Sequence, residues 1–167
     1  MNNKKIMNLV HGAMIAAAYA ATTYLSALLG IAYGPIQFRF SEVLTVFPIF
    51  TPAAIPGLAI GCILGNISSP FGIWDIAFGS LATLLAAIAA RKLRTVTFKG
   101  LPLLSIIMPV IFNALIVGAE ITLLMPTEEA NFAAFVIAAL EVGAGELVVC
   151  LAGGIPIYYA LKKTRIF

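Results

Sequence analysis

The residues of this chain that could do chemistry are the few polar ones set within long apolar runs. Arg39 and Glu42 stand three residues apart, between an uncharged run from Ile6 to Phe38 and another from Val43 to Trp74. Further polar or amphipathic side chains follow, namely Asn66, Trp74, Asp75, Asn113, Glu120, Glu141 and Glu146. Polar groups are costly to bury in apolar surroundings unless they are paired, so we expect these side chains to face a cavity.

This set of residues is strongly acidic. One base, Arg39, stands against five acids, which are Glu42, Asp75, Glu120, Glu141 and Glu146. A pocket with this lining suits a ligand that is rich in N–H donors or carries a positive charge, and a phosphorylated ligand is disfavoured. Flat apolar surfaces occur beside the acids at Phe38, Phe40, Phe71 and Trp74. Carboxylates next to aromatic rings indicate a site for a planar nitrogen heterocycle.

Helical spacing relates some of these residues to one another. Asn113 and Glu120 differ by seven residues, so they share one helix face and could line one cavity. Glu141 and Glu146 differ by five residues and point about 140° apart, so they need not face the same space. The role of Glu146 is left open.

Several of these residues also have a purely structural interpretation. Arg39 and Glu42 could form a local ion pair that anchors a loop, and Asp75 could stabilise the first turn of a helix. Trp74 could be an aromatic residue of the membrane interface. Asn113 could hydrogen-bond a neighbouring helix.

The sequence disfavours several classes of function. Cys62 and Cys150 are isolated, with no Cys-x-x-Cys pair or histidine cluster, so neither a disulfide framework nor a metal site is expected. His11 has no partner residues at protease spacing, and no phosphate-binding loop is present. We therefore expect no enzymatic activity and no cofactor. The basic residues sit in short clusters at the ends of apolar segments, so nucleic-acid binding is not expected either.

Composition places the elements that must position these residues in a lipid bilayer. The chain has 167 residues, of which 62% are hydrophobic and 10% charged, and its mean hydropathy is +1.06. Soluble domains carry roughly 25% charged residues, and a chain of this length could not hide so much apolar surface in its own interior. The sequence predicts an integral membrane protein.

The apolar segments predict a single all-α domain over residues 1–167, a bundle of six transmembrane helices. Their expected ranges are about 6–29, 41–50, 55–67, 74–90, 102–124 and 131–161. The first segment resembles a signal peptide, but its apolar run is long, so we expect a retained membrane helix. The last segment is too long for a straight crossing, and a bend is expected near Gly153-Gly154-Ile155-Pro156.

Two stripes of small residues at four-residue spacing allow helices to approach closely in lipid. They are Ala13-Ala17-Ala21 in the first helix and Gly57-Gly61-Gly65 in the third. The alanine stripe could pack within the bundle or dock another membrane subunit, and the sequence leaves both readings open.

Basic residues predict the orientation, because cytoplasmic loops are enriched in lysine and arginine. The clusters are Lys4/Lys5, the segment 91–99, and Lys162/Lys163/Arg165. Six helices place all three clusters on one side, so both termini should be cytoplasmic. The loop with the Gly34-Pro35 turn signal would then face outward, together with Arg39, Glu42 and the other polar groups.

These residues resemble those of a known family. Arg39-Phe40-Ser41-Glu42, the segment Thr51–Gly57 and Asp75 followed by Phe78–Thr83 resemble the substrate-binding membrane subunit, or S component, of energy-coupling factor (ECF) transporters. The queuosine-precursor (QueT) subgroup is the most similar. The alanine stripe resembles the Ala-x-x-x-Ala motif by which S components dock.

The resemblance implies a fold, partners and a ligand. Such proteins have six helices in a prokaryotic cell membrane, capture a vitamin-like solute from outside, and associate with a transmembrane coupling protein and two ATPase subunits. The ligand would be a 7-deazaguanine precursor of queuosine.

A guanine-like ring would need a carboxylate to accept its adjacent N–H groups, from Glu42, Glu120 or Glu141. Its carbonyl would need a donor, from Asn66, Asn113 or Arg39. Asp75 could take an ammonium group, and Trp74 or Phe40 could stack on the ring. Arg39 would orient Glu42 or close the site. Two alternatives stay open: a different heterocycle such as thiamine or riboflavin, and a membrane scaffold protein without a solute.

Overall fold

The computed structural model describes residues 3–34 and 36–164, and helices make up most of these residues. Pro35 and Arg165, which the sequence analysis used, lie outside the described residues. In chain order the elements are α1 (Asn3–Leu28), the 3₁₀ helix η1 (Phe40–Ile49), α2 (Ala54–Gly65), the 3₁₀ turn η2 (Asn66–Ser68), α3 (Ile73–Leu93), α4 (Leu103–Leu124), α5 (Phe132–Val149), the π-helical turn η3 (Cys150–Gly154) and α6 (Ile155–Thr164). When α5, η3 and α6 are taken together, each expected range agrees with an observed one to within one helical turn at both ends.

Four helices are long and apolar enough to cross a membrane, over Asn3–Leu28, Ile73–Leu93, Leu103–Leu124 and Phe132–Thr164. The segments Phe40–Ile49 and Ala54–Ser68 are apolar but shorter. The expected all-α membrane bundle is confirmed.

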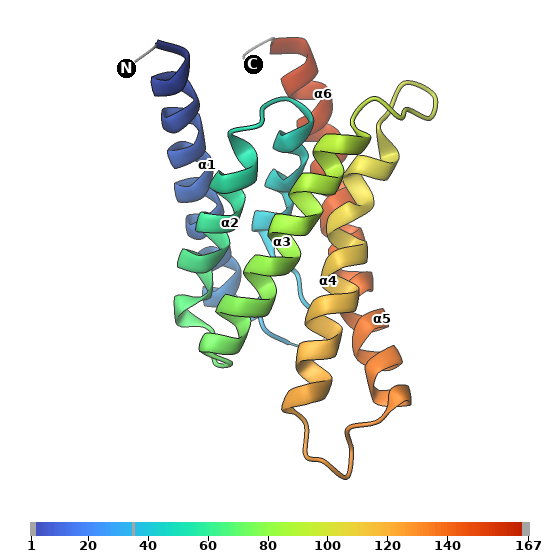
Figure 1. The fold of residues 1–167 in the computed structure, drawn as a ribbon. Helices are drawn as coiled ribbons and strands as arrows, with labels where there is room; N and C mark the ends of the chain where they lie inside the picture. Colours follow the sequence, from blue (N-terminus) through green and yellow to red (C-terminus); the bar gives the residue numbers. More distant parts are fainter. Residues whose placement is uncertain (1–2, 35, 165–167) are drawn as a thin grey trace.

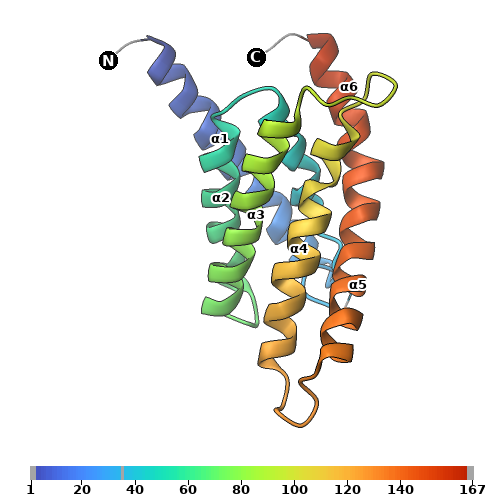
Figure 2. The same cartoon turned by 45° about the vertical axis from the view of Figure 1, so that its right-hand side comes forward.

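The last span is interrupted where the sequence predicts a bend. α5, η3 and α6 follow one another along one side of the bundle (Figure 2), and the π-helical turn covers Cys150–Gly154. Pro156 lacks a backbone N–H and so cannot bond the carbonyl four residues earlier, at Ala152. A π-helical turn of this kind is a known way to absorb such a defect within a helix.

The start of α1, the end of α6 and the 94–102 connection lie at one end of the molecule, and the turns 66–72 and 125–131 lie at the other (Figure 1). We call these the terminal end and the far end. The basic residues Lys4, Lys5, Arg91 to Lys99, Lys162 and Lys163 therefore gather at the terminal end, and Glu128 and Glu129 at the far end.

Close packing between α1 and α2 depends on the glycine stripe of α2. A Cβ atom added to Gly57 would lie 2.7 Å from the carbonyl oxygen of Gly12, and one added to Gly61 would lie 2.7 Å from Cβ of Tyr19. Contacts this short do not occur between real side chains, so only glycine allows the two helices to meet. The inward face of α1 carries Ala16, while Ala13, Ala17 and Ala21 stay exposed.

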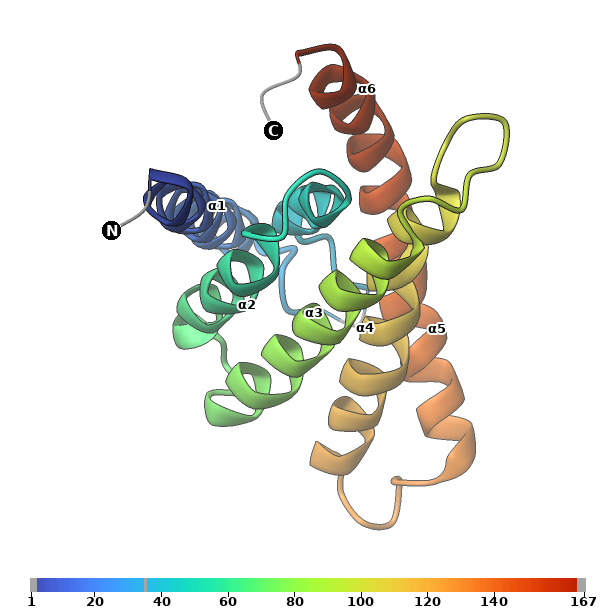
Figure 3. The same cartoon turned by 45° about the horizontal axis from the view of Figure 1, so that its top comes forward.

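η1 is the central element of the bundle. It packs against α1, α2 and α3 on one side and α4, α5, η3 and α6 on the other. In Figure 3 this cyan helix lies between α1 and α6, with α3 and α4 closing the bundle beside it. A polar residue on η1 therefore enters the middle of the molecule.

Candidate solute-binding site

Arg39 and Glu42 are buried at the start of η1, and only 3% and 2% of their surfaces are exposed. Arg39 has an extended backbone, with φ −92° and ψ 107°, and the 3₁₀ helix begins at the next residue. Because Arg39 precedes the helix and has an extended backbone, its side chain does not follow the helical spacing that would place it beside Glu42. The two residues consequently take different partners.

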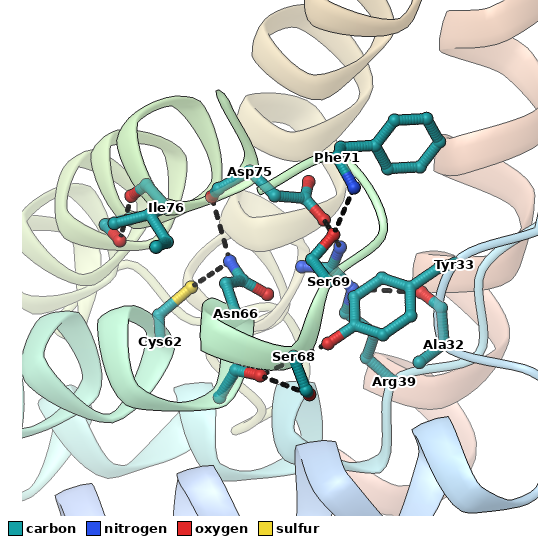
Figure 4. A network of polar contacts seen from close by, with 12 residues as sticks. Ala32, Tyr33, Arg39, Cys62, Asn66, Ser68, Ser69, Phe71, Asp75 and Ile76 are labelled. Carbon is teal, nitrogen blue, oxygen red and sulfur yellow. Dashed lines mark hydrogen bonds and ion pairs between the residues drawn. The ribbon is translucent and has the colours of Figure 1, made fainter. Parts of the chain in front are cut away.

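The partner of Arg39 is Asp75 rather than Glu42. Its Nη2 atom lies 3.5 Å from Oδ2 of Asp75, and its Nε donates a hydrogen bond of 3.2 Å to the carbonyl oxygen of Ala32. The guanidinium also stands over the Tyr33 ring, 5.3 Å from its centroid (Figure 4). Burial by itself lowers the pKa of Arg39, but the summed attraction of the surrounding acidic groups, of which Asp75 contributes most, outweighs burial and the pKa is raised. Arg39 is therefore a fixed cation.

Asp75 joins the end of α2 to the start of α3. Its carboxylate accepts a hydrogen bond from Ser69, and its backbone carbonyl accepts one of 2.9 Å from Nδ2 of Asn66 (Figure 4). Gly79 makes room for this arrangement, because a Cβ there would lie 2.8 Å from Nδ2 of Asn66. Asp75 thus has a structural role, and Oδ1 of Asn66 is left facing the interior.

Glu42 takes its hydrogen bond from α1. The hydroxyl of Tyr19 donates to Oε1 of Glu42, whereas Oε2 has no hydrogen-bond partner within residues 3–34 and 36–164. On the other side, Sγ of Cys150 lies 4.0 Å from the carbonyl oxygen of Glu42 and 3.9 Å from Oε2 of Glu146. Helices α1, η1 and α5 and the η3 turn therefore meet around Glu42.

Glu120 and Glu146 complete the group from α4 and α5. Each is 2% exposed. Glu120 interacts electrostatically with Asp75 and Arg39, and Glu146 with Glu42 and Arg39. Arg39 is therefore the cation shared by four buried carboxyl groups, and among the described residues only Asp75 forms an ion pair with it.

Arg39, Ser41, Glu42, Asn66, Asp75, Asn113, Glu120 and Glu146 are buried together, and we call them the polar cluster. Several of their polar atoms have no hydrogen-bond partner among the described residues. They are Oγ of Ser41, Oε2 of Glu42, Oδ1 of Asn66, Nδ2 of Asn113, and both carboxylate oxygens of Glu120. Native proteins rarely leave buried polar atoms unsatisfied. Acceptors outnumber donors here, so the cluster matches a ligand that presents several N–H groups and one acceptor.

Two expected residues do not join the polar cluster. Trp74 is 49% exposed, and its ring stands 6.0 Å from that of Phe78. It precedes Asp75 by one residue and so points about 100° away from it. Glu141 is half-buried, and its side chain makes no hydrogen bond or ion pair with any other residue that the structure describes.

Tyr19 and Ser41 were not predicted as site residues from the sequence, and the role of Glu146 was left open. The available signal for Tyr19 was helical phase, since it lies on the same face of α1 as Ala16, which opposes the glycine stripe of α2. For metal binding, the described part of the chain holds no group of three or more His, Cys, Asp or Glu side chains suited to an ion.

A second feature is an apolar groove of about 680 Å³ between α1 and α2, which begins near the terminal end. Its lining includes Lys5, Gly12, Ala13, Ala17, Pro56 and Ile60. Two of the three residues of the alanine stripe thus line the groove, and Ala21 is exposed one turn further along. The groove is open and is lined mainly by small and apolar side chains, unlike the polar cluster.

Comparisons with known proteins agree with these features. The family described as QueT transporter matches residues 9–163. The "Queuosine precursor transporter QueT" of Lactococcus lactis subsp. cremoris (strain MG1363) is 39% identical over 85 residues, which are 51% of this chain and 50% of that protein. The match thus spans about half the length of that relative. No solved structure matches. Because the family match covers nearly the whole described bundle, the chain belongs to the QueT transporter family.

Proposed function

We propose that this chain is the substrate-capturing membrane subunit of an ECF-type importer and that it binds a 7-deazaguanine precursor of queuosine. Family membership supports a transport function, and the similar protein from Lactococcus lactis is named for a queuosine precursor. The observation that carries the choice of ligand is the set of buried acceptors without partners on η1, η2 and α4.

The free atoms suggest how the ring is held. Glu120 interacts with Asp75, but neither of its carboxylate oxygens accepts a hydrogen bond from a described residue, so the two oxygens suit the adjacent ring N–H and amino group on the guanine edge. Asn113 lies seven residues earlier on the same face, and its side chain, which interacts with Glu146, can turn its Nδ2 to donate to the neighbouring ring carbonyl. Glu42 has one free oxygen and reaches the ring from η1, so it accepts a single N–H from the opposite end of the ligand.

The groove between α1 and α2 supports the second half of the proposal. Small residues on an exposed membrane helix allow a partner helix to approach closely. We assign the groove and the alanine stripe to the transmembrane coupling protein, which works with two ATPase subunits. The basic terminal end is assigned to the cytoplasm of a prokaryotic cell, which leaves the polar cluster nearer the outer surface.

Calorimetric titration of the purified protein tests the ligand. We expect saturable binding of 7-deazaguanine and of 7-aminomethyl-7-deazaguanine, with no binding of thiamine or riboflavin. Calorimetry is preferable to tryptophan fluorescence because Trp74 stands outside the polar cluster. Binding of thiamine or riboflavin alone would overturn the ligand assignment, and a protein that binds none of the four compounds would be a scaffold rather than a capturing subunit.

A further inference from the structure

We propose that Tyr19 is a positioning residue for ligand binding, which acts by fixing Glu42 so that one of its oxygens is presented to the solute. This inference rests on the proposed function, because it takes Glu42 as a ligand contact. It assigns a role in the site to α1, a helix for which the sequence suggested only packing within the bundle or docking of a partner.

The first step is the contact itself. Tyr19 is completely buried on α1, and its hydroxyl donates to Oε1 of Glu42, 23 residues away on η1. Hydrogen bonds to a charged acceptor are about twice as strong as neutral ones. This bond therefore holds one oxygen of the carboxylate and leaves Oε2 free.

The second step is the rigidity of the donor. The Tyr19 side chain is held against α2 at Gly61, where an added Cβ would lie 2.7 Å from Cβ of Tyr19 and 2.8 Å from the carbonyl oxygen of Ala16. α1 and α2 thus fix the phenol before a ligand arrives. A carboxylate that is positioned in advance loses less conformational freedom on binding.

The third step is the absence of a competing anchor. Arg39, the nearest cation in sequence, pairs with Asp75. Of the hydrogen bonds among the described residues that reach the Glu42 carboxylate, the one from Tyr19 is the only one found. Without that hydroxyl the Glu42 side chain would be free to rotate within the polar cluster.

The test is a pair of double-mutant cycles on ligand affinity. Tyr19→Phe removes one oxygen and keeps the ring and the Cβ that packs against Gly61. Tyr24→Phe is the matched control, because Tyr24 lies on the same helix and its hydroxyl donates to the carbonyl oxygen of Leu64 and not to Glu42. The probe is 7-deazaguanine, measured by competition against its radiolabelled form so that weak binding can be read.

We expect Tyr19→Phe to weaken binding about tenfold and Tyr24→Phe to leave it unchanged. In a Glu120→Gln background, Tyr19→Phe should still weaken binding about tenfold. In a Glu42→Gln background, it should weaken binding less than twofold, because the phenol acts through Glu42. If Glu42→Gln removes all measurable binding, the cycle is repeated with Glu42→Asp, whose shorter side chain withdraws the carboxylate from Tyr19. The effect of Tyr19→Phe should again shrink from about tenfold to less than twofold in that background.

Unchanged affinity in Tyr19→Phe, or the same loss in every background, would overturn the inference, since a purely structural role predicts the latter. A Tyr19→Phe protein that does not fold also counts against it, because a positioning hydroxyl is not needed for folding. Failure of the unmodified protein to bind the probe would instead count against the proposed function.

Discussion

The polar cluster and the groove between α1 and α2 are both bounded by α1, and they differ in burial and in polarity. Glu42 and Glu120 in the cluster are almost completely buried, with carboxylate oxygens that no described residue satisfies. The groove is open and lined mainly by small and aliphatic side chains, such as Ala13 and Ala17. One helix therefore serves two surfaces of opposite chemistry.

This difference indicates what each surface can hold. An enclosed set of polar atoms favours a small, donor-rich solute, because every unsatisfied group must find a partner there. An open stripe of small residues favours another helix, because packing rather than hydrogen bonding holds helices together in lipid. Tyr19 and Ala17 are two residues apart on α1, and their side chains point about 160° apart, which keeps the two surfaces separate.

The largest effect is expected in the polar cluster, at Glu42. Glu42→Gln removes the charge and keeps the shape, and the loss of a charge-assisted hydrogen bond should weaken 7-deazaguanine binding roughly 100-fold. Assembly with the coupling protein should not change. Calorimetry measures 7-deazaguanine binding, and co-purification measures assembly with the coupling protein, both on one preparation.

The control for this variant is Glu129→Gln, in an exposed position of the α4–α5 turn. It should bind the ligand as the unmodified protein does. If Glu42→Gln bound with full affinity, or if the control lost affinity to the same extent, the polar cluster would not be the solute site.

Much of the fold could be predicted from the sequence. Helix ranges followed from apolar segment length, and the interruption of the last helix followed from Pro156, since a missing N–H has a local consequence. The glycine stripe of α2 likewise predicted a close helix contact, and it packs against α1. These are local properties of the chain, and they do not depend on how the helices are rotated.

The rotation of each helix could not be predicted, and it decides the membership of the polar cluster. In a soluble protein an amphipathic pattern marks the inward face, but in a membrane both the lipid-facing and the inward face are apolar. Glu141 and Glu146 were therefore equivalent by pattern, although the structure buries only Glu146. The pairing of Arg39 with Asp75 was missed for a related reason, since it depends on the extended backbone at Arg39.

The second prediction places a large side chain in the groove. Ala17→Trp fills part of the space that a partner helix would occupy, and overpacking of this kind costs about 1–3 kcal/mol. We expect about a tenfold decrease in the amount of coupling protein and ATPases that co-purify, with 7-deazaguanine binding unchanged.

Ala18→Trp is the matched control, because Ala18 is exposed on the same helix but does not line the groove. It should assemble normally. Equal loss of assembly in both variants would mean that bulk on α1 disturbs membrane insertion, and normal assembly of Ala17→Trp would remove the groove from the docking surface.

The smallest effect on ligand binding is expected from the two acids of α5, Glu141 and Glu146. Comparing them tests which of the two belongs to the polar cluster. The turn that carries Glu146 faces the interior because Gly145 lets it approach the loop, where an added Cβ would lie 2.2 Å from the carbonyl oxygen of Gln37. Glu146→Gln should weaken 7-deazaguanine binding about fivefold, the scale of one net hydrogen bond. Glu141→Gln, five residues earlier on a half-buried face, should change it less than twofold. Calorimetric titration of both variants would decide between them, and a larger loss in Glu141→Gln would require α5 to be rotated by more than a third of a turn when the ligand binds.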